Sequence, residues 1–276
     1  MLFTQSFVEN SISAPSRATL LTGLYSHQHG QTRLGCCLNP QKQWFTELLQ
    51  KEGYVTSVFG KWHLNVEPKG FDHYDILFDQ GEYYNPKFRR PDTNGEYIKE
   101  KGYATTLITD HAIEWLEKNI SDEKPFCVLV NHKAPHRNEQ VGRLLDYLEE
   151  KGVLDNTVIV YTSDQGFLLG EHGLYDKRFM YEESFRTPLI ISCPSLVKKH
   201  SVCKELVQNI DLAPTFLSLA GVEVPKEMSG RSLLPLFKNG KAENWRNELY
   251  YHFYDYPAVG SVRKHDGIRT KRYKLI

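Results

Sequence analysis

The sequence has no excess of charge of either sign and no long hydrophobic run. Its 276 residues include 34 Lys plus Arg and 34 Asp plus Glu, so the formal net charge is zero. Proteins that bind nucleic acid or an anionic membrane usually carry a basic excess. The longest apolar stretches, such as residues 126–130, are far shorter than the roughly 18 residues of a membrane helix. We therefore expect no nucleic-acid partner and no membrane span.

Cysteine is scarce and irregularly spaced. The five cysteines are an odd number at no metal-ligand spacing: Cys36, Cys37, Cys127, Cys193 and Cys203. This pattern indicates small buried side chains rather than a disulfide framework. Hydrophobic residues make up 40% of the chain, which is typical of a globular protein. A chain of this length has room for one large domain or two small ones.

Short β-rich runs alternate with amphipathic stretches along the chain. The β-rich runs cover residues 54–59, 126–131, 157–162 and 188–192, and helical spacing covers 105–118, 138–151 and 211–221. Because three of the β-rich runs are apolar on both faces, they are typical of central strands that helices cover on each side. The order predicts an α/β fold, most simply a mainly parallel sheet with helices on both faces. In the last helix, Asp211 is expected to cap the N-terminus and Gly221 to end it.

Residues 246–276 have a different pattern, which is aromatic, basic and alternating. This pattern predicts a small antiparallel sheet, and the chain ends at Ile276 within it. We therefore expect a main α/β domain over residues 1–245. Residues 246–276 are expected to be the start of a C-terminal antiparallel subdomain that is cut short.

Polar side chains follow three of the predicted strands at the point where each strand ends. They are Lys61 and His63 after the first, His136 after the second, and Asp164 and Gln165 after the third. Ligands of open α/β sheets bind outside the carboxyl ends of the strands, so we expect these side chains to share one edge. With Arg17 and Lys177, the cations suit an anionic substrate. The oxygens of Asp164 and Gln165 suit Ca²⁺ or Mg²⁺ rather than zinc, although Ca²⁺ takes about six to eight oxygens.

Residues 13–23 carry the sharpest local pattern. Pro15 and Ser16 suit the first turn of a helix, and Gly23 suits its end. Ser13 then sits just before the helix N-terminus, where free amides and the helix dipole favour an anion. Arg17 can reach back with two hydrogen bonds to an oxyanion. The alternative is a capped helix with a surface arginine.

Five motifs, in order, resemble those of the type I sulfatases. The first is Ser13-Ala14-Pro15-Ser16-Arg17 with Leu21-Thr22-Gly23, which matches (Cys/Ser)-x-Pro-Ser-Arg followed by Leu-Thr-Gly. The others are Gly60-Lys61-Trp62-His63, Ala134-Pro135-His136, Thr162-Ser163-Asp164-Gln165-Gly166, and the stretch 173–188 with Lys177. The chain therefore resembles the serine-type, formylglycine-dependent sulfatases, and among them the N-acetylglucosamine-6-sulfatases. The resemblance implies an alkaline-phosphatase-like α/β fold and hydrolysis of sulfate esters.

For catalysis, the resemblance implies a role for each matching residue. Ser13, converted to formylglycine by a radical-SAM sulfatase-modifying enzyme, would attack sulfur with one oxygen of its hydrated aldehyde. Because a second hydroxyl stays on the same carbon, sulfate can then leave by elimination. Lys61, Lys177 and His136 would bind sulfate, and His136 would also assist the leaving alcohol. His63 would help to remove the proton from the second hydroxyl.

For the metal, the resemblance implies Ca²⁺, in preference to Mg²⁺, held by Asp164, Gln165 and Ser13. Arg17 would hold the aldehyde hydrate and help to fix the metal. Family members begin with a strand that ends in two Asp ligands, and a long segment normally follows the position of His136. Here we expect the chain to start after that strand, and residue 137 runs almost directly into the predicted helix. We therefore expect residues 1–245 to be a sulfatase catalytic domain without its first strand and without an internal segment near residue 137, which binds Ca²⁺ poorly and turns over little.

The substrate class follows from the same resemblance. Residues 70–86 are aromatic and glycine-rich and could line a sugar site by stacking, although ordinary loop packing explains them equally well. With residues 176–178 and 261–274, they resemble the subgroup that desulfates glycosaminoglycans and mucins. We therefore expect a sulfated carbohydrate substrate, with N-acetylglucosamine-6-sulfate as the leading candidate, and a periplasmic or secreted protein.

Three other functions stay open. A phosphonate or phosphate monoester hydrolase of the same fold would share these motifs, since some such relatives also use formylglycine. A non-catalytic sulfatase remnant would be consistent with the missing acidic pair. A serine hydrolase that uses Ser13, a histidine and Asp164 is disfavoured, because the Gly-x-Ser-x-Gly elbow is absent and no histidine has an evident carboxylate partner in the sequence.

Overall fold

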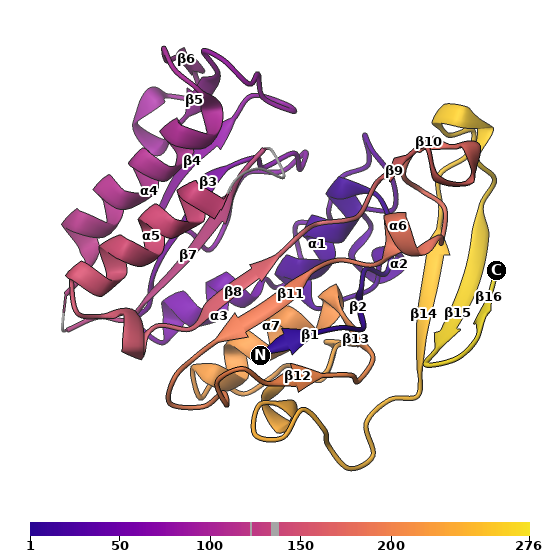
Figure 1. Ribbon diagram of the computed structural model, residues 1–276. Helices are drawn as coiled ribbons and strands as arrows, with labels where there is room; N and C mark the ends of the chain where they lie inside the picture. The colour runs from indigo at the N-terminus through magenta and orange to yellow at the C-terminus, as the bar shows by residue number, and fades with distance from the viewer. Residues whose placement is uncertain (122, 134–137) are drawn as a thin grey trace. The chain divides into compact units, whose positions relative to one another are not determined.

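The computed structural model describes residues 1–121, 123–133 and 138–276, and the chain forms two compact units (Figure 1). Unit 1 consists of Met1–Phe45, Leu64–Val66 and Asn156–Ile276, and unit 2 consists of Thr46–His63 and Glu67–Asp155. Each unit combines a β-sheet with helices, so the predicted α/β class is confirmed. Within the described ranges, no helix has the length and the apolar character needed to cross a membrane.

Unit 1 contains a four-stranded sheet in the order β12-β1-β11-β8. Its strands are β1 (Leu2–Phe3), β8 (Ile159–Thr162), β11 (Leu189–Ser192) and β12 (Val202–Cys203). The strands β1 and β12 run parallel, but β11 is antiparallel to both β1 and β8. This sheet is therefore mixed, where the sequence predicted a mainly parallel one.

The connection between β8 and β11 explains this difference. Parallel neighbours need a long crossover, usually an α-helix. Between β8 and β11 the described residues instead form a hairpin of β9 (Leu168–Leu169) and β10 (Tyr175–Asp176), followed by the short helix α6 (Glu182–Phe185). Without a long amphipathic helix to cross the sheet, the chain returns as an antiparallel neighbour.

Three helices of unit 1 are α1 (Ser13–Thr22), α2 (Ser26–His29) and α7 (Leu212–Leu219). The helix α7 packs against β11 in an apolar cluster that includes Leu189, Ile191 and Leu212, each at most 2% exposed. Hydrophobic burial of this kind contributes about 25 cal/mol for each Å² of apolar surface removed from water. It fixes β11 and α7 as the scaffold of this unit.

Asp211 occupies the N-cap position of α7, as predicted, but its side chain makes no capping hydrogen bond. The carboxylate of Asp211 is fully buried and accepts two hydrogen bonds from Arg246, at 2.8 and 2.6 Å. It also accepts the backbone N–H groups of Gln208 and Arg231, each at 2.8 Å. A buried carboxylate is stabilised more by a charged two-pronged donor than by a helix amide, and it is therefore directed to Arg246.

The last residues of unit 1 form an antiparallel sheet, as the sequence predicted. Its strands are β14 (Glu248–Phe253), β15 (His265–Thr270) and β16 (Lys274–Leu275), in that order. In β14, Leu249, Tyr251 and Phe253 alternate into the interior with exposures of 2% or less. A separate parallel pair joins β2 (Ser6–Phe7) to β13 (Val207–Gln208).

Unit 2 contains a five-stranded sheet in the order β6-β5-β4-β3-β7. Its strands are β3 (Val55–Gly60), β4 (His73–Leu77), β5 (Lys87–Arg89), β6 (Ile98–Lys99) and β7 (Phe126–Asn131). The strand β3 is parallel to β4 and to β7, while β5 is antiparallel to β4 and to β6. This sheet holds the parallel strands that the sequence predicted.

Two helices of unit 2, α4 (Ala104–Asn119) and α5 (Asn138–Glu150), lie side by side in Figure 1. Apolar residues of α4 and α5, such as Ile108 and Leu144, pack in one cluster with Phe59 of β3 and Val128 of β7. The short helix α3 (Phe45–Lys51) spans the point in the sequence where unit 1 passes into unit 2.

Most predicted elements are confirmed to within two residues. The run 126–131 is β7, the run 54–59 begins one residue later as β3, and the predicted helix 138–151 is α5. The cysteines are free, and Cys193 and Cys203 are buried as predicted, but Cys37 is exposed. Burial was therefore the wrong expectation for Cys37, which lies in a loop.

Candidate active site

Ser13 is the first residue of helix α1. Ile12 before it is extended, with φ −131° and ψ 138°, and Pro15 lies in the first turn, where no intrahelical donor is lost. The helix ends at Gly23, whose φ of 65° is the left-handed conformation that glycine adopts freely, and its N–H donates to the carbonyl of Thr19 at 2.8 Å. The predicted helix over residues 13–23 is confirmed, and Ser13 is only 3% exposed.

Asp164 meets both Ser13 and Arg17 at this helix end. The Ser13 hydroxyl donates to Asp164 Oδ2, and Arg17 Nε donates to the same oxygen at 3.0 Å and to Ser13 Oγ at 3.2 Å. Residues four apart lie on the same face of a helix, which places Arg17 one turn behind Ser13. The side chains of Arg17 and Asp164 are 14% and 22% exposed, so this ion pair is partly shielded from water.

The β9-β10 hairpin brings Lys177 into the same unit. Leu168 pairs with Asp176 in antiparallel register, which brings the neighbouring residues Phe167 and Lys177 opposite each other. Lys177 Nζ lies 5.5 Å from the centre of the Phe167 ring. Burial lowers the pKa of Lys177, and the negative charge of Asp164 opposes this effect. The hairpin therefore supplies a partly desolvated cation on which the charge of Asp164 acts.

Gln165 holds its side-chain oxygen in the interior. The Oε1 atom of Gln165 is buried and has no hydrogen-bond partner among the described residues. The following residue, Gly166, packs so tightly that a Cβ there would lie 1.9 Å from the carbonyl oxygen of Glu183. The chain therefore packs closely against α6 at Gly166, and Gln165 keeps one buried oxygen for a ligand.

The buried carboxyl group of Glu9 is hydrogen-bonded to α1, and the sequence analysis did not predict it. Glu9 is 1% exposed and accepts hydrogen bonds from Thr19 Oγ1 of α1 at 2.7 Å and from Ser26 Oγ of α2 at 2.6 Å. Burial raises the pKa of Glu9 to about 7, and the hydrogen bonds from Ser26 and Thr19 oppose the rise. The sequence feature that could have indicated this buried acid is its position directly after the apolar pair Phe7-Val8.

His29 completes this network in its neutral form. Its Nδ1 accepts the N–H of Gln31 at 3.1 Å, and its Nε2 lies 3.0 Å from Thr19 Oγ1. Burial lowers the pKa of His29 to about 3. Since Nδ1 is an acceptor, the proton of the neutral ring is on Nε2, which donates to Thr19, and Thr19 donates in turn to Glu9.

In unit 2, Lys61 and His63 follow β3. Gly60 pairs with Asn131 of β7, and the Lys61 N–H donates to the Asn131 carbonyl at 2.8 Å. Gly60 has a φ of 89°, and a Cβ there would lie 2.3 Å from that carbonyl oxygen, so glycine is required at this junction. His63 also has a positive φ, 52°, and its Nε2 lies 2.7 Å from Gln80 Nε2.

Two histidines follow β7 in the sequence, and the structure describes His132 but not His136. His132 is turned inward, with Nε2 3.0 Å from Thr109 Oγ1, and burial lowers its pKa to about 4. His136, the predicted sulfate ligand, lies outside the described residues. His132 is therefore a neutral internal residue and not a second candidate for that role.

The structure places the predicted site residues in two groups. Unit 1 holds Ser13, Arg17, Asp164, Gln165 and Lys177, and unit 2 holds Lys61 and His63. The expected shared edge is confirmed for the strand ends of β3 and β7, which pair in parallel register. The strand β8 belongs to the sheet of unit 1, so the shared edge of Asp164 with Lys61 stays a prediction, as do the catalytic roles.

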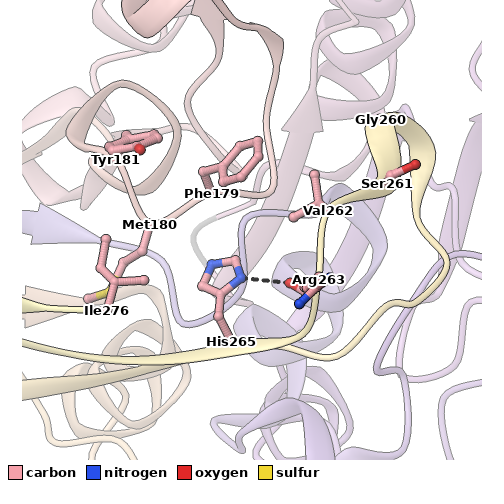
Figure 2. A pocket seen from close by; sticks show the side chains of 9 residues that line it. All are labelled: Phe179, Met180, Tyr181, Gly260, Ser261, Val262, Arg263, His265 and Ile276. Carbon is pink, nitrogen blue, oxygen red and sulfur yellow. Dashed lines mark hydrogen bonds between the residues drawn. The ribbon is translucent and has the colours of Figure 1, made fainter.

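A hollow of about 340 Å³ in unit 1 lies outside this set of residues (Figure 2). It is lined in part by Phe179, Met180, Tyr181 and Val262, and Figure 2 shows His265 donating from Nδ1 to the carbonyl of Arg263, at 2.9 Å. Part of its lining falls within residues 261–274, which the sequence analysis linked to the substrate class, but no predicted catalytic or metal-binding residue lines it. We therefore do not assign it to the active site.

Comparison with known families identifies the class of protein. Residues 1–140 match the sulfatase family, and residues 170–276 match the C-terminal region of N-sulphoglucosamine sulphohydrolase. The chain belongs to the sulfatase family, which makes it a sulfuric ester hydrolase by descent. The predicted family and the alkaline-phosphatase-like fold are confirmed.

Individual relatives show which sulfatases the chain is similar to. The chain is 37% identical to an N-acetylglucosamine-6-O-sulfatase of Bacteroides thetaiotaomicron, over 99% of this chain and 71% of that protein. It is 27% identical to human N-acetylglucosamine-6-sulfatase, over 92% of this chain and 61% of that protein. A protein solved in complex with its substrate D-glucosamine-2-N,6-O-disulfate has a TM-score of 0.94 and 37% identity, over 99% of this chain and 80% of that one.

Proposed function

We propose that this protein removes the 6-O-sulfate of a glucosamine unit, such as N-acetylglucosamine-6-sulfate in a glycosaminoglycan or mucin, through a formylglycine derived from Ser13. The observation that carries the proposal is the contact of Ser13 with both Asp164 and Arg17 at the start of α1. The names of two relatives support the choice of sugar, because both are N-acetylglucosamine 6-sulfatases.

The position of Ser13 suits a nucleophile that must attack an anion. The first amides of a helix have no intrahelical partner, and together with the helix dipole they favour negative charge. Arg17 adds a fixed cation one turn behind, which stabilises an oxyanion at the same end. Formylglycine, once formed at Ser13 and hydrated by water, would supply a carbon with two hydroxyls. One can attack sulfur with release of the sugar alcohol, and the other can then expel sulfate as the aldehyde forms again.

The donor set of unit 1 fits Ca²⁺ in kind. Asp164 and Gln165 provide hard oxygen atoms, and the buried Oε1 of Gln165, which has no hydrogen-bond partner among the described residues, supports a ligand at this position. The Ser13 side chain adds a third oxygen. Three atoms fall short of the about six to eight oxygens that Ca²⁺ takes. Among the described residues, no group of three or more His, Cys, Asp or Glu side chains could hold a metal ion.

The remaining roles are assigned by chemistry. Lys177 would bind sulfate oxygens. Burial disfavours the charged form of its ammonium group, and a bound anion would stabilise that form again. Lys61 and His136 would bind sulfate with it, and His136 would assist the leaving alcohol. His63 would accept a proton from the second hydroxyl, as a general base.

The test is sulfate release by the chain produced together with a radical-SAM sulfatase-modifying enzyme, in millimolar Ca²⁺. We expect faster release from N-acetylglucosamine-6-sulfate than from an aryl sulfate or a 2-O-sulfated uronic acid, and none from the Ser13→Ala variant. Mass spectrometry of the peptide that contains Ser13 should record the loss of two hydrogen atoms. An unmodified Ser13 in that host would favour a non-catalytic remnant instead.

A second candidate function is hydrolysis of phosphonate or phosphate monoesters. The observation that favours it is 41% identity, over 49% of this chain and 29% of the other protein, to a multifunctional alkaline phosphatase superfamily protein of Trinickia caryophylli. Matched sulfate and phosphate esters of one alcohol separate the two functions. Faster release of phosphate than of sulfate would contradict our proposal.

The maturation enzyme and the compartment are part of the same proposal. Two relatives with 28% and 29% identity are named as extracellular sulfatase homologues, of Caenorhabditis elegans and Drosophila melanogaster. A polymeric substrate outside the cell would require an exported enzyme. We therefore assign the protein to the periplasm or the cell exterior, which fractionation of the producing cell tests directly.

A further inference from the structure

Lys133 leaves the same strand edge of unit 2 as Lys61. It lies two residues beyond Asn131, the last residue of β7, and Asn131 pairs with Gly60 at the end of β3. The hydrogen bond from the Lys61 N–H to the Asn131 carbonyl, at 2.8 Å, continues this register by one step. Two lysines therefore follow two hydrogen-bonded parallel strands at their carboxyl ends.

The loop after β4 holds Lys133 in place. Lys133 Nζ donates to the carbonyl of Gln80 at 3.1 Å and lies 4.3 Å from the centre of the Tyr83 ring. The side-chain nitrogen of the same Gln80 lies 2.7 Å from His63 Nε2. One short loop thus contacts both Lys133 and His63, a candidate catalytic residue.

The charges at this edge favour an anion. Burial lowers the pKa of Lys133, and the nearby Asp79 opposes this effect. The Asp79 side chain is 66% exposed and 3.7 Å from His63 Nε2, so water screens its charge. An ammonium group has three N–H donors. Within the described part of the chain, the Gln80 carbonyl takes one of them, which leaves capacity for a ligand oxygen.

We propose that Lys133 is a specificity-determining residue, which binds a second anionic group of the substrate beside the sulfate ester. This inference rests on the proposed function, because it requires Lys61 and His63 to face the reacting sulfate. The chemistry recognised is a further sulfate or carboxylate on the sugar. The Tyr83 ring next to the ammonium offers an apolar face on which a pyranose can pack.

Two sugars that differ in the second anion test the inference. D-glucosamine-2-N,6-O-disulfate carries it, and N-acetylglucosamine-6-sulfate does not. Calorimetric titration of the unconverted Ser13 chain in millimolar Ca²⁺ gives both affinities without turnover. A charged hydrogen bond is worth enough that Lys133→Met should lower the ratio of the two affinities about ten-fold.

Matched variants make the result specific. Lys133→Arg keeps a cation and should retain most of the ratio. Lys118→Met, at an exposed lysine of α4 in the same unit, should leave the ratio as in the parent chain. The ratio of kcat/KM values for the two sugars, measured on the converted enzyme, should change in the same direction as the affinities.

Two outcomes would overturn the inference, and they are distinguishable. If Lys133→Met lowers both affinities by the same factor, or changes neither, Lys133 does not bind the second anion, while the proposed function stands. If the converted parent chain hydrolyses neither sugar, the proposed function fails and takes the inference with it.

Discussion

Glu9 makes the stability of this protein depend on pH in an unusual direction. Burial raises its pKa from 4.5 to about 7, so the folded state holds a proton that the unfolded chain releases between these values. Linkage then requires stability to be highest below pH 4.5 and to fall as the pH rises to about 7. A shift of about 2.5 units corresponds to about 3 kcal/mol, and full burial of Glu9 leaves little solvent screening.

His29 acts in the opposite direction and would obscure this effect in the parent chain. Burial lowers its pKa from 6.5 to about 3, so the folded state excludes a proton that the unfolded chain binds. Its contribution is present above pH 6.5 and is lost as the pH falls toward 3. The slopes of Glu9 and His29 therefore partly cancel between pH 4.5 and 6.5.

The difference between the parent chain and Glu9→Gln isolates the Glu9 contribution. Glutamine keeps an oxygen that can accept from Thr19 and Ser26 but cannot ionise. We expect the free energy of unfolding of Glu9→Gln, relative to the parent, to rise by about 3 kcal/mol between pH 4.5 and 7.5. Urea denaturation across this range measures it, with the exposed Glu96→Gln as control.

A pH-independent difference would refute the reasoning. It would mean that Glu9 keeps one ionisation state from pH 4.5 to 7.5, and that its two hydroxyl donors outweigh the cost of burying the charge. A changing difference in Glu96→Gln would have the same force, because it would show that the trend does not come from burial.

Four further predictions follow from single sites. Asp164→Ala should lower sulfate release at least about 100-fold, because the charge that orders Arg17 and the proposed metal is lost, whereas the exposed Asp155→Ala should not. Calorimetry should find Ca²⁺ dissociation constants of about 0.1–1 mM, given the small oxygen set. Gly60→Ala should cost about 2–4 kcal/mol on thermal unfolding, and more than Gly53→Ala, which has a similar φ of 84° but nothing within 4 Å. For His111, burial acts to lower the pKa, but the hydrogen bond to Asp75 and the charges of Asp75 and Glu100 outweigh it and raise the pKa. Stability that is present below pH 6.5 should therefore be lost as the pH rises through the raised value, and urea denaturation of His111→Gln should lack this loss.

The sequence predicted the elements of this fold better than their pairing. Local signals such as Pro15 and Gly23 determine where α1 begins and ends, and the apolar run 126–131 is β7. The antiparallel return of β11 against β8 depends on what the connection between them can form. That choice involves long-range contacts and leaves no periodic pattern in either strand.

The candidate site shows the same division. Ser13 and Arg17 could be predicted as neighbours, since four residues make about one helical turn. The Glu9 network could not, because it joins residues on three separate segments through side-chain hydrogen bonds. Likewise, the contact of Gln80 with His63 depends on the course of the loop after β4, for which the sequence offers no more than aromatic and glycine residues.

Four polar residues of α1 contact three different parts of unit 1. Ser13 and Arg17 lie about 40° apart around the helix axis and both contact Asp164. Ser16 lies on another side and accepts from Asn209 Nδ2 at 2.8 Å. Thr19 points to Glu9 and His29. The site-facing side of α1 is thus fixed by its buried sides, so a substitution at Thr19 should displace Ser13 without touching it.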